Sequence, residues 1–140
     1  MRRQEGFTLI EVMIVVAIIA IIASMAIPSI LNARKASNEA SATSALRTLT
    51  TANNQYRTRF QSYAAALTNL SASGHLDDVV ASGTKSGYTF TYAGGQDTWT
   101  TNADPTAAGS SGDRGFFVDT SGVIRFVASG AASATSAPIE

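Results

Sequence analysis

A single carboxylate, Glu11, interrupts a long apolar run near the start of this chain of 140 residues. The run covers residues 7–31 and reads FTLIEVMIVVAIIAIIASMAIPSIL, with Gly6 directly before it. A charged side chain inside a membrane helix costs roughly 3 kcal/mol or more, so it is expected to have a function and a partner. The alternative is that the run is an ordinary, uncleaved membrane anchor. Glu11 lies near one end of the run, so its side chain could then extend into the water.

The other titratable side chains predict no catalytic centre. His75 is the only histidine, and we expect it in a solvated connecting segment. The chain has no cysteine, which excludes disulfides, thiolate metal sites and a cysteine nucleophile. Asp77 and Asp78 are expected to cap a short helix. We therefore expect no enzyme and no cofactor.

Four further aspartates are spread over expected turns and strand ends: Asp97, Asp104, Asp113 and Asp119. Aspartate is a common turn residue, so we assign them to turns and expect no metal ion, with a calcium site as the minor alternative. Ten basic residues balance ten acidic ones, and no basic cluster predicts contact with nucleic acid.

The apolar run is long enough to span a membrane. As a helix, residues 7–31 would extend roughly 37 Å, against a hydrocarbon layer about 30 Å thick. Arg2 and Arg3 would hold the preceding end on the cytoplasmic side. Pro28 removes a helical hydrogen bond and predicts a kink or a locally unwound turn. The small-x-small pattern at residues 24–26 leaves a further alternative, cleavage by ordinary signal peptidase to release a soluble domain.

The rest of the chain, residues 32–140, predicts one α+β head built from a long helix and an antiparallel sheet of about four strands. The helix is expected to continue to about residue 63, because apolar residues recur at spacings of three and four: Ala42, Ala45, Leu46, Leu49, Ala52, Tyr56, Phe60 and Tyr63. A connector over 64–86 is expected to hold a short helix, and 87–127 the strands. The Ala- and Ser-rich residues 128–140 predict a flexible tail.

Within 87–127, alternation of aromatic residues and threonine predicts a first strand at Tyr88, Phe90 and Tyr92. Further strands are expected over 99–103, 115–119 and 123–127. Residues 107–113 are small and polar, which predicts an exposed loop, and Asp119-Thr120-Ser121-Gly122 has the composition of a turn.

The sequence Gly6-Phe7-Thr8-Leu9-Ile10-Glu11 resembles the processing motif of type IV prepilins and of type II secretion pseudopilins. The resemblance implies the type IV pilin fold, with a long N-terminal helix packed on the sheet. It also implies that prepilin peptidase removes a leader, residues 1–6, between Gly6 and Phe7 and N-methylates Phe7. The resemblance further implies that Glu11 pairs with the N-terminal amine of a neighbouring subunit during assembly.

By this resemblance the chain is a structural subunit of a type IV pilus that serves adhesion, motility or DNA uptake. Residues 114–125, RGFFVDTSGVIR, also resemble the terminal hairpin of many cysteine-free type IVa pilins, which favours a subunit similar to the type IVa major pilins. It would begin as a single-pass precursor in the inner membrane and end in an extracellular filament on the bacterial surface. Its partners would be further copies of itself in a helical homopolymer, prepilin peptidase, the pilus assembly platform and minor pilins. The alternatives are a type II secretion pseudopilin, a minor pilin and a binding protein on an ordinary anchor.

One segment bears on the choice between pilin and pseudopilin. Major pseudopilins usually carry a D-P-W-G segment and an acidic calcium loop, whereas Asp104-Pro105 is followed here by Thr106-Ala107. This difference favours the pilus subunit.

Overall fold

The structure, a computed structural model, describes residues 6–139. Of the predicted leader it describes only Gly6, and the expected role of Arg2 and Arg3 lies outside the described residues. The described chain divides between Ala33 and Arg34 into an N-terminal unit and a head, and each is considered by itself.

The long helix α1 comprises Leu9–Phe60 and supplies residues to both units. It continues through Pro28, so the kink or unwound turn at that residue stays a prediction. The helix ends where Gln61 adopts a φ of 59°, with its N–H 2.8 Å from the carbonyl oxygen of Arg57. A residue in this left-handed conformation commonly ends a helix, because it turns the chain away while satisfying a free carbonyl.

The connector between α1 and the sheet contains more regular structure than the predicted short helix. Two short helices, α2 (Leu67–Ala72) and α3 (Asp78–Ala81), precede the first strand, β1 (Thr84–Lys85). The predicted cap is present at Asp77, whose side chain accepts the N–H of Val79 at 3.0 Å. Leu70 and Val80 bury themselves in the core and thereby fix the two helices beside the sheet.

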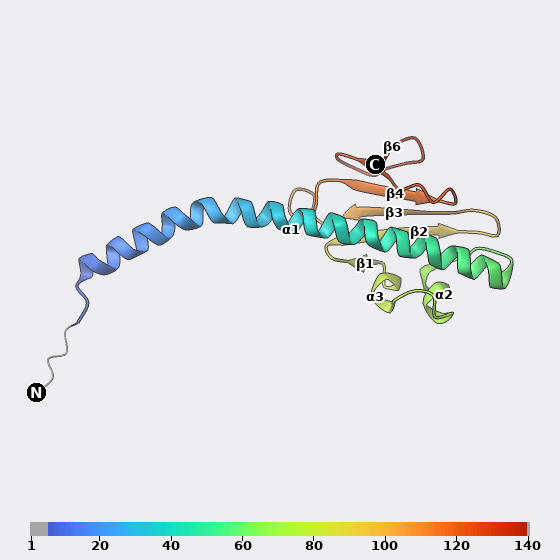
Figure 1. The fold of residues 1–140 in the computed structure, drawn as a ribbon, viewed down its shortest axis with the longest axis horizontal. Helices are drawn as coiled ribbons and strands as arrows, with labels where there is room; N and C mark the ends of the chain where they lie inside the picture. The colour runs from blue at the N-terminus through green and yellow to red at the C-terminus, as the bar shows by residue number, and fades with distance from the viewer. Residues whose placement is uncertain (1–5, 140) are drawn as a thin grey trace, which may run out of the picture. The chain divides into compact units, whose positions relative to one another are not determined.

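The sheet is an antiparallel meander of six strands in chain order. After β1 the strands are β2 (Tyr88–Gly94), β3 (Trp99–Pro105), β4 (Gly115–Asp119), β5 (Arg125–Val127) and β6 (Ala137–Pro138). Figure 1 shows the head portion of α1 crossing this sheet. The α+β class is confirmed, and the two strands beyond the predicted four are the two-residue edge strands β1 and β6.

The face of the sheet that α1 covers carries the hydrophobic core. Register places Phe90, Ala103 and Phe116 side by side, and all three are buried. Leu46 and Leu49 of α1 pack in the same cluster, together with Trp99. The alternation predicted for β2 therefore points Tyr88 and Phe90 toward the helix.

The opposite face of the sheet is crossed by residues 128–136, which we call the C-terminal strap. Asn102 Nδ2 donates to the carbonyl oxygen of Ala132 at 2.7 Å, and Arg125 Nη1 donates to that of Ser136 at 3.1 Å. Phe117 lies between Asn102 and Arg125 in register and is only 8% exposed. The segment predicted to be a flexible tail thus instead packs on the sheet and leads into β6, because sheet side chains bind its backbone.

Candidate functional site

The N-terminal end of α1 is organised by a reciprocal pair of hydrogen bonds between Thr8 and Glu11. The Glu11 carboxylate accepts the Thr8 N–H at 2.8 Å and the Thr8 hydroxyl at 2.7 Å, both through Oε2. The Glu11 N–H lies 3.3 Å from the Thr8 hydroxyl oxygen. This is a capping box, in which a threonine before the helix and a glutamate three residues later satisfy each other's free N–H groups.

The capping box leaves half of the Glu11 carboxylate free. Both bonds use Oε2, and among residues 6–139 no group donates to Oε1. Sequence reasoning assigned a role to Glu11 but overlooked Thr8, although the T-x-x-E spacing was a readable signal. The carboxylate can therefore stabilise its own helix and still accept a hydrogen bond or a cation from outside the chain.

The apolar side chains around and after Glu11 are exposed in the part of the chain that the structure describes. Every Leu, Ile, Val and Met between Leu9 and Leu31 is 38% to 78% exposed. An 18-residue window of α1 has a mean hydropathy of 2.8 and none of it is buried. Burial of apolar surface stabilises by roughly 25 cal/mol per Å², so this segment requires lipid or other protein around it.

Gly6 and Phe7 lie just before the helix and contact little. A Cβ atom added to Gly6 would meet nothing within 4 Å, and Phe7 is 90% exposed. The packing of residues 6–139 therefore does not require glycine at position 6.

The head does not bring its acidic side chains together. Within the described residues, no three His, Asp or Glu side chains converge to hold a metal ion. His75 is half-buried, with Nδ1 2.9 Å from the Ser73 hydroxyl. Asp119 forms the predicted turn, in which its carbonyl oxygen accepts the N–H of Gly122 at 2.9 Å.

One charged site in the head was not predicted. Glu39 of α1 is 8% exposed and accepts the N–H groups of Asp113 and Arg114 at 3.1 and 3.3 Å, and Nε of Arg114 at 2.8 Å. Burial alone would raise the pKa of Glu39, but these hydrogen bonds outweigh it and hold the pKa below its ordinary value. We call this contact between Glu39 and residues 113–114 the clasp.

The clasp changes the expectation for residues 107–113, which the sequence predicted to be an exposed loop. Gly112 is buried, and the Ser111 carbonyl oxygen accepts Asn38 Nδ2 at 2.8 Å. Lys35 adds an ion pair with Asp113 at 3.2 Å. Three side chains within five residues of α1 thus hold the end of this loop against the helix.

Comparison with known proteins supports the reading of the N-terminus. Residues 1–27 match the family described as the prokaryotic N-terminal methylation motif. No curated protein sequence matches the chain. The matched residues include the capping box and most of the exposed apolar segment. The chain carries the prepilin signature of the type IV pilins and pseudopilins, on an α+β head consistent with the type IV pilin fold.

Proposed function

We propose that this precursor is cut between Gly6 and Phe7, N-methylated on Phe7 and polymerised through its apolar helix into a type IV pilus. The observation that carries the proposal is the half-occupied carboxylate of Glu11. Cleavage would create a cationic amine on Phe7, and the free Oε1 of a neighbouring subunit's Glu11 could accept it. Such charge-assisted bonds are strong where water is excluded.

The exposed apolar segment supports polymerisation for a second reason. Its side chains need a nonaqueous surrounding both before and after assembly. Lipid of the inner membrane supplies it for the single-pass precursor, and the packed helices of other subunits supply it in the filament. During assembly the helices of other subunits replace the lipid beside the segment, so its apolar side chains do not contact water at any stage. The finished filament lies on the bacterial surface.

Gly6 supports cleavage at the proposed bond. The structure has room for a side chain there, so an effect of substitution on processing would come from the peptidase. Glycine suits an extended segment that enters a narrow protease site, because it lacks a side chain. We expect Gly6→Leu to leave the precursor uncut, which the intact mass of the membrane-bound chain would show.

The direct test is electron microscopy of filaments sheared from the cell surface, combined with mass spectrometry of their subunit. We expect a subunit that begins at Phe7 and carries one added methyl group. A chain that retains Met1, or that begins at Ile27, would refute the proposal. If deletion of the gene for this chain abolishes protein export but leaves surface filaments in place, the chain is a pseudopilin. The pseudopilins share the matched motif.

The role of Glu11 is tested by substitution. Glu11→Ala should still be processed, while the critical concentration for assembly rises on the order of tenfold, the effect of losing about 1.4 kcal/mol per subunit contact, so that fewer filaments form. Ser24→Ala is the matched control, because Ser24 only bonds the Ile21 carbonyl oxygen of its own helix. Thr8→Val removes the capping hydroxyl but keeps the carboxylate, so it should assemble better than Glu11→Ala. Equal yields from Glu11→Ala and Ser24→Ala would refute the pairing.

A further inference from the structure

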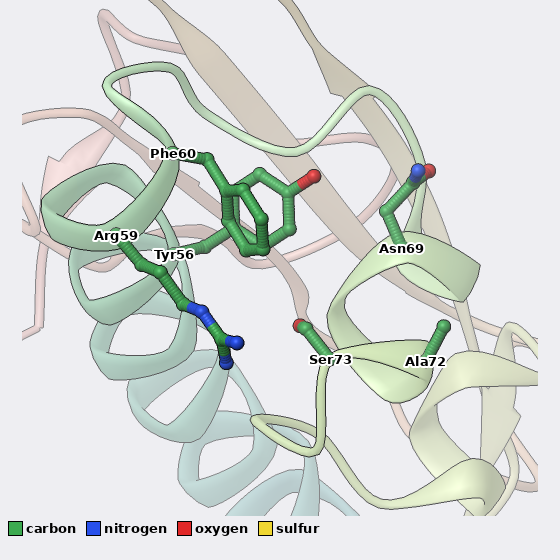
Figure 2. Close-up of a pocket in the computed structure, with 6 residues that line it drawn as sticks. All are labelled: Tyr56, Arg59, Phe60, Asn69, Ala72 and Ser73. Carbon is green, nitrogen blue, oxygen red and sulfur yellow. The ribbon is translucent and has the colours of Figure 1, made fainter.

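The head contains a hollow between the last turn of α1 and the short helix α2. Its cavity volume is about 360 Å³, and it is lined by Tyr56, Arg59, Phe60, Asn69, Ala72 and Ser73. Figure 2 shows the two aromatic rings on the α1 side and the three smaller side chains on the α2 side. The volume lies at the lower end of the roughly 300–1,000 Å³ of small-molecule sites.

The α1 side of the hollow is an aromatic wall at the edge of the core: Tyr56 is partly buried and packs against the core, whereas Phe60 lies outside it. Tyr56 and Phe60 pack on each other with ring centroids 4.4 Å apart. Phe60 is 46% exposed, although it was predicted to continue the buried stripe of the helix. The ring of Phe60 therefore packs on Tyr56 and leaves apolar surface free, which a ligand in the hollow could cover.

The charge of the hollow is positive. The Arg59 guanidinium lies 5.3 Å from the centroid of the Phe60 ring, and neither ion pair of the described residues involves Arg59. Its neighbour Arg57, in contrast, donates to the Tyr63 hydroxyl at 2.9 Å. A guanidinium without an anion, beside an apolar wall, favours a ligand that brings a carboxylate.

The polar rim indicates what else the ligand carries. Among the described side-chain hydrogen bonds, none involves the Tyr56 hydroxyl or the Asn69 amide, whereas Ser73 already donates to the Leu70 carbonyl oxygen. A hydroxyl and an amide can each donate and accept. We propose that this hollow binds an acidic saccharide. The apolar side of the sugar ring would face Tyr56 and Phe60, its carboxylate Arg59, and its hydroxyl groups Asn69.

This site is separate from the apolar segment through which polymerisation is proposed, because all of its residues belong to the head. The test uses the full processed chain in detergent and two probes, methyl β-glucuronoside and methyl β-glucoside. They differ only in that a carboxylate replaces the hydroxymethyl group. Saturation-transfer NMR reports which sugar protons approach the protein, and a titration gives the dissociation constant of each probe.

We expect the glucuronoside to bind at millimolar concentrations, at least tenfold more tightly than the glucoside, with affinity that falls as salt is added. Arg59→Gln should remove this preference for the acid, and Phe60→Ala should abolish the signals of both probes. Arg47→Gln is the matched control, an exposed arginine of the same helix outside the hollow, and should bind as the parent does. Fluorescence of Trp99, the only tryptophan, verifies that each variant is folded.

Three results would overturn the proposal. The first is the absence of transfer signals from the glucuronoside, and the second is binding that Arg59→Gln and Arg47→Gln affect equally. The third is a variant Arg59→Gln that binds the probe normally but yields fewer filaments, since the hollow would then be a contact between subunits.

Discussion

Removal of the Glu39 carboxylate should destabilise the head by about 2 to 3 kcal/mol. Hydrogen bonds to a charged group contribute roughly 1.5–3 kcal/mol each, and breaking a buried ion pair costs roughly 3–5 kcal/mol. The expected cost of breaking the clasp is below that upper range, because the Arg114 side chain is 43% exposed and water can replace its lost partner. The destabilisation expected for Glu39→Ala is therefore smaller than the summed energies of its three hydrogen bonds.

The assay is urea unfolding of the full chain in detergent, followed by the fluorescence of Trp99. This residue is 2% exposed in the core of the head, so its emission reports the head and not the apolar segment. Asp113→Ala is the matched control. It removes a carboxylate that is 55% exposed and paired with Lys35, but keeps the backbone N–H that Glu39 binds. Its expected cost is below about 1 kcal/mol.

Acid supplies an independent check. The folded head lowers the pKa of Glu39 below the ordinary 4.5, so this carboxylate contributes its full stability above that pH. The contribution is lost as the pH falls through the folded pKa. Glu39→Gln cannot titrate, so its free energy of unfolding should be lower than that of the parent at neutral pH, and the difference should shrink as the pH falls below 4.5. A difference that grows in acid, or a Glu39→Ala variant as stable as Asp113→Ala, would refute the clasp.

Two further substitutions test the head. Tyr92→Phe removes a hydroxyl that lies 2.7 Å from Asn53 Oδ1 and 2.8 Å from the Ala64 carbonyl oxygen. Because both acceptors are buried, the same urea assay should show that the free energy of unfolding falls by about 1 to 2 kcal/mol. Gly115→Ala places a Cβ against the Gly130 carbonyl oxygen, so the C-terminal strap should lift; hydrogen exchange should then accelerate at residues 128–136 and stay unchanged in α1.

Local pattern was sufficient to predict the elements that recur with a period. The spacing of three and four along α1 identified Ala42, Leu46 and Leu49, which are all buried. The alternation around Phe90 identified β2 and its inward face. These features could be read because each depends on the period of one helix or strand, which the sequence carries directly.

The polar members of the same stripe were overlooked. Glu39 and Asn53 continue the spacing of α1 in both directions and are buried, but a search for apolar residues passes over them. Their partners, Arg114 and Tyr92, are more than thirty residues away. A buried polar residue is stable only with such a partner, and pattern within one element cannot show which distant residue supplies it.

The C-terminal strap was missed for a related reason. Residues 128–136 have little apolar surface of their own, which is why their composition predicted flexibility. What orders them is the set of donors on the sheet, chiefly Asn102 and Arg125, which bind backbone carbonyl groups that any sequence would offer. The residues that order the strap therefore belong to β3 and β5 and not to the strap itself.

The clasp and the strap together explain how a head without cysteine closes its C-terminal half. A disulfide would tie this region to the rest of the head through one covalent bond. Here the loop before β4 is held to α1 through Glu39, and the chain after β5 is held to the outer face of the sheet through Asn102. Both contacts bracket β4, the strand that carries the buried Phe116 and Phe117.

Because the two contacts attach to opposite faces, loss of either one leaves β4 covered on the other side. The Glu39→Ala and Gly115→Ala variants should therefore each retain a folded head, and combining them should cost more than the sum of the two changes.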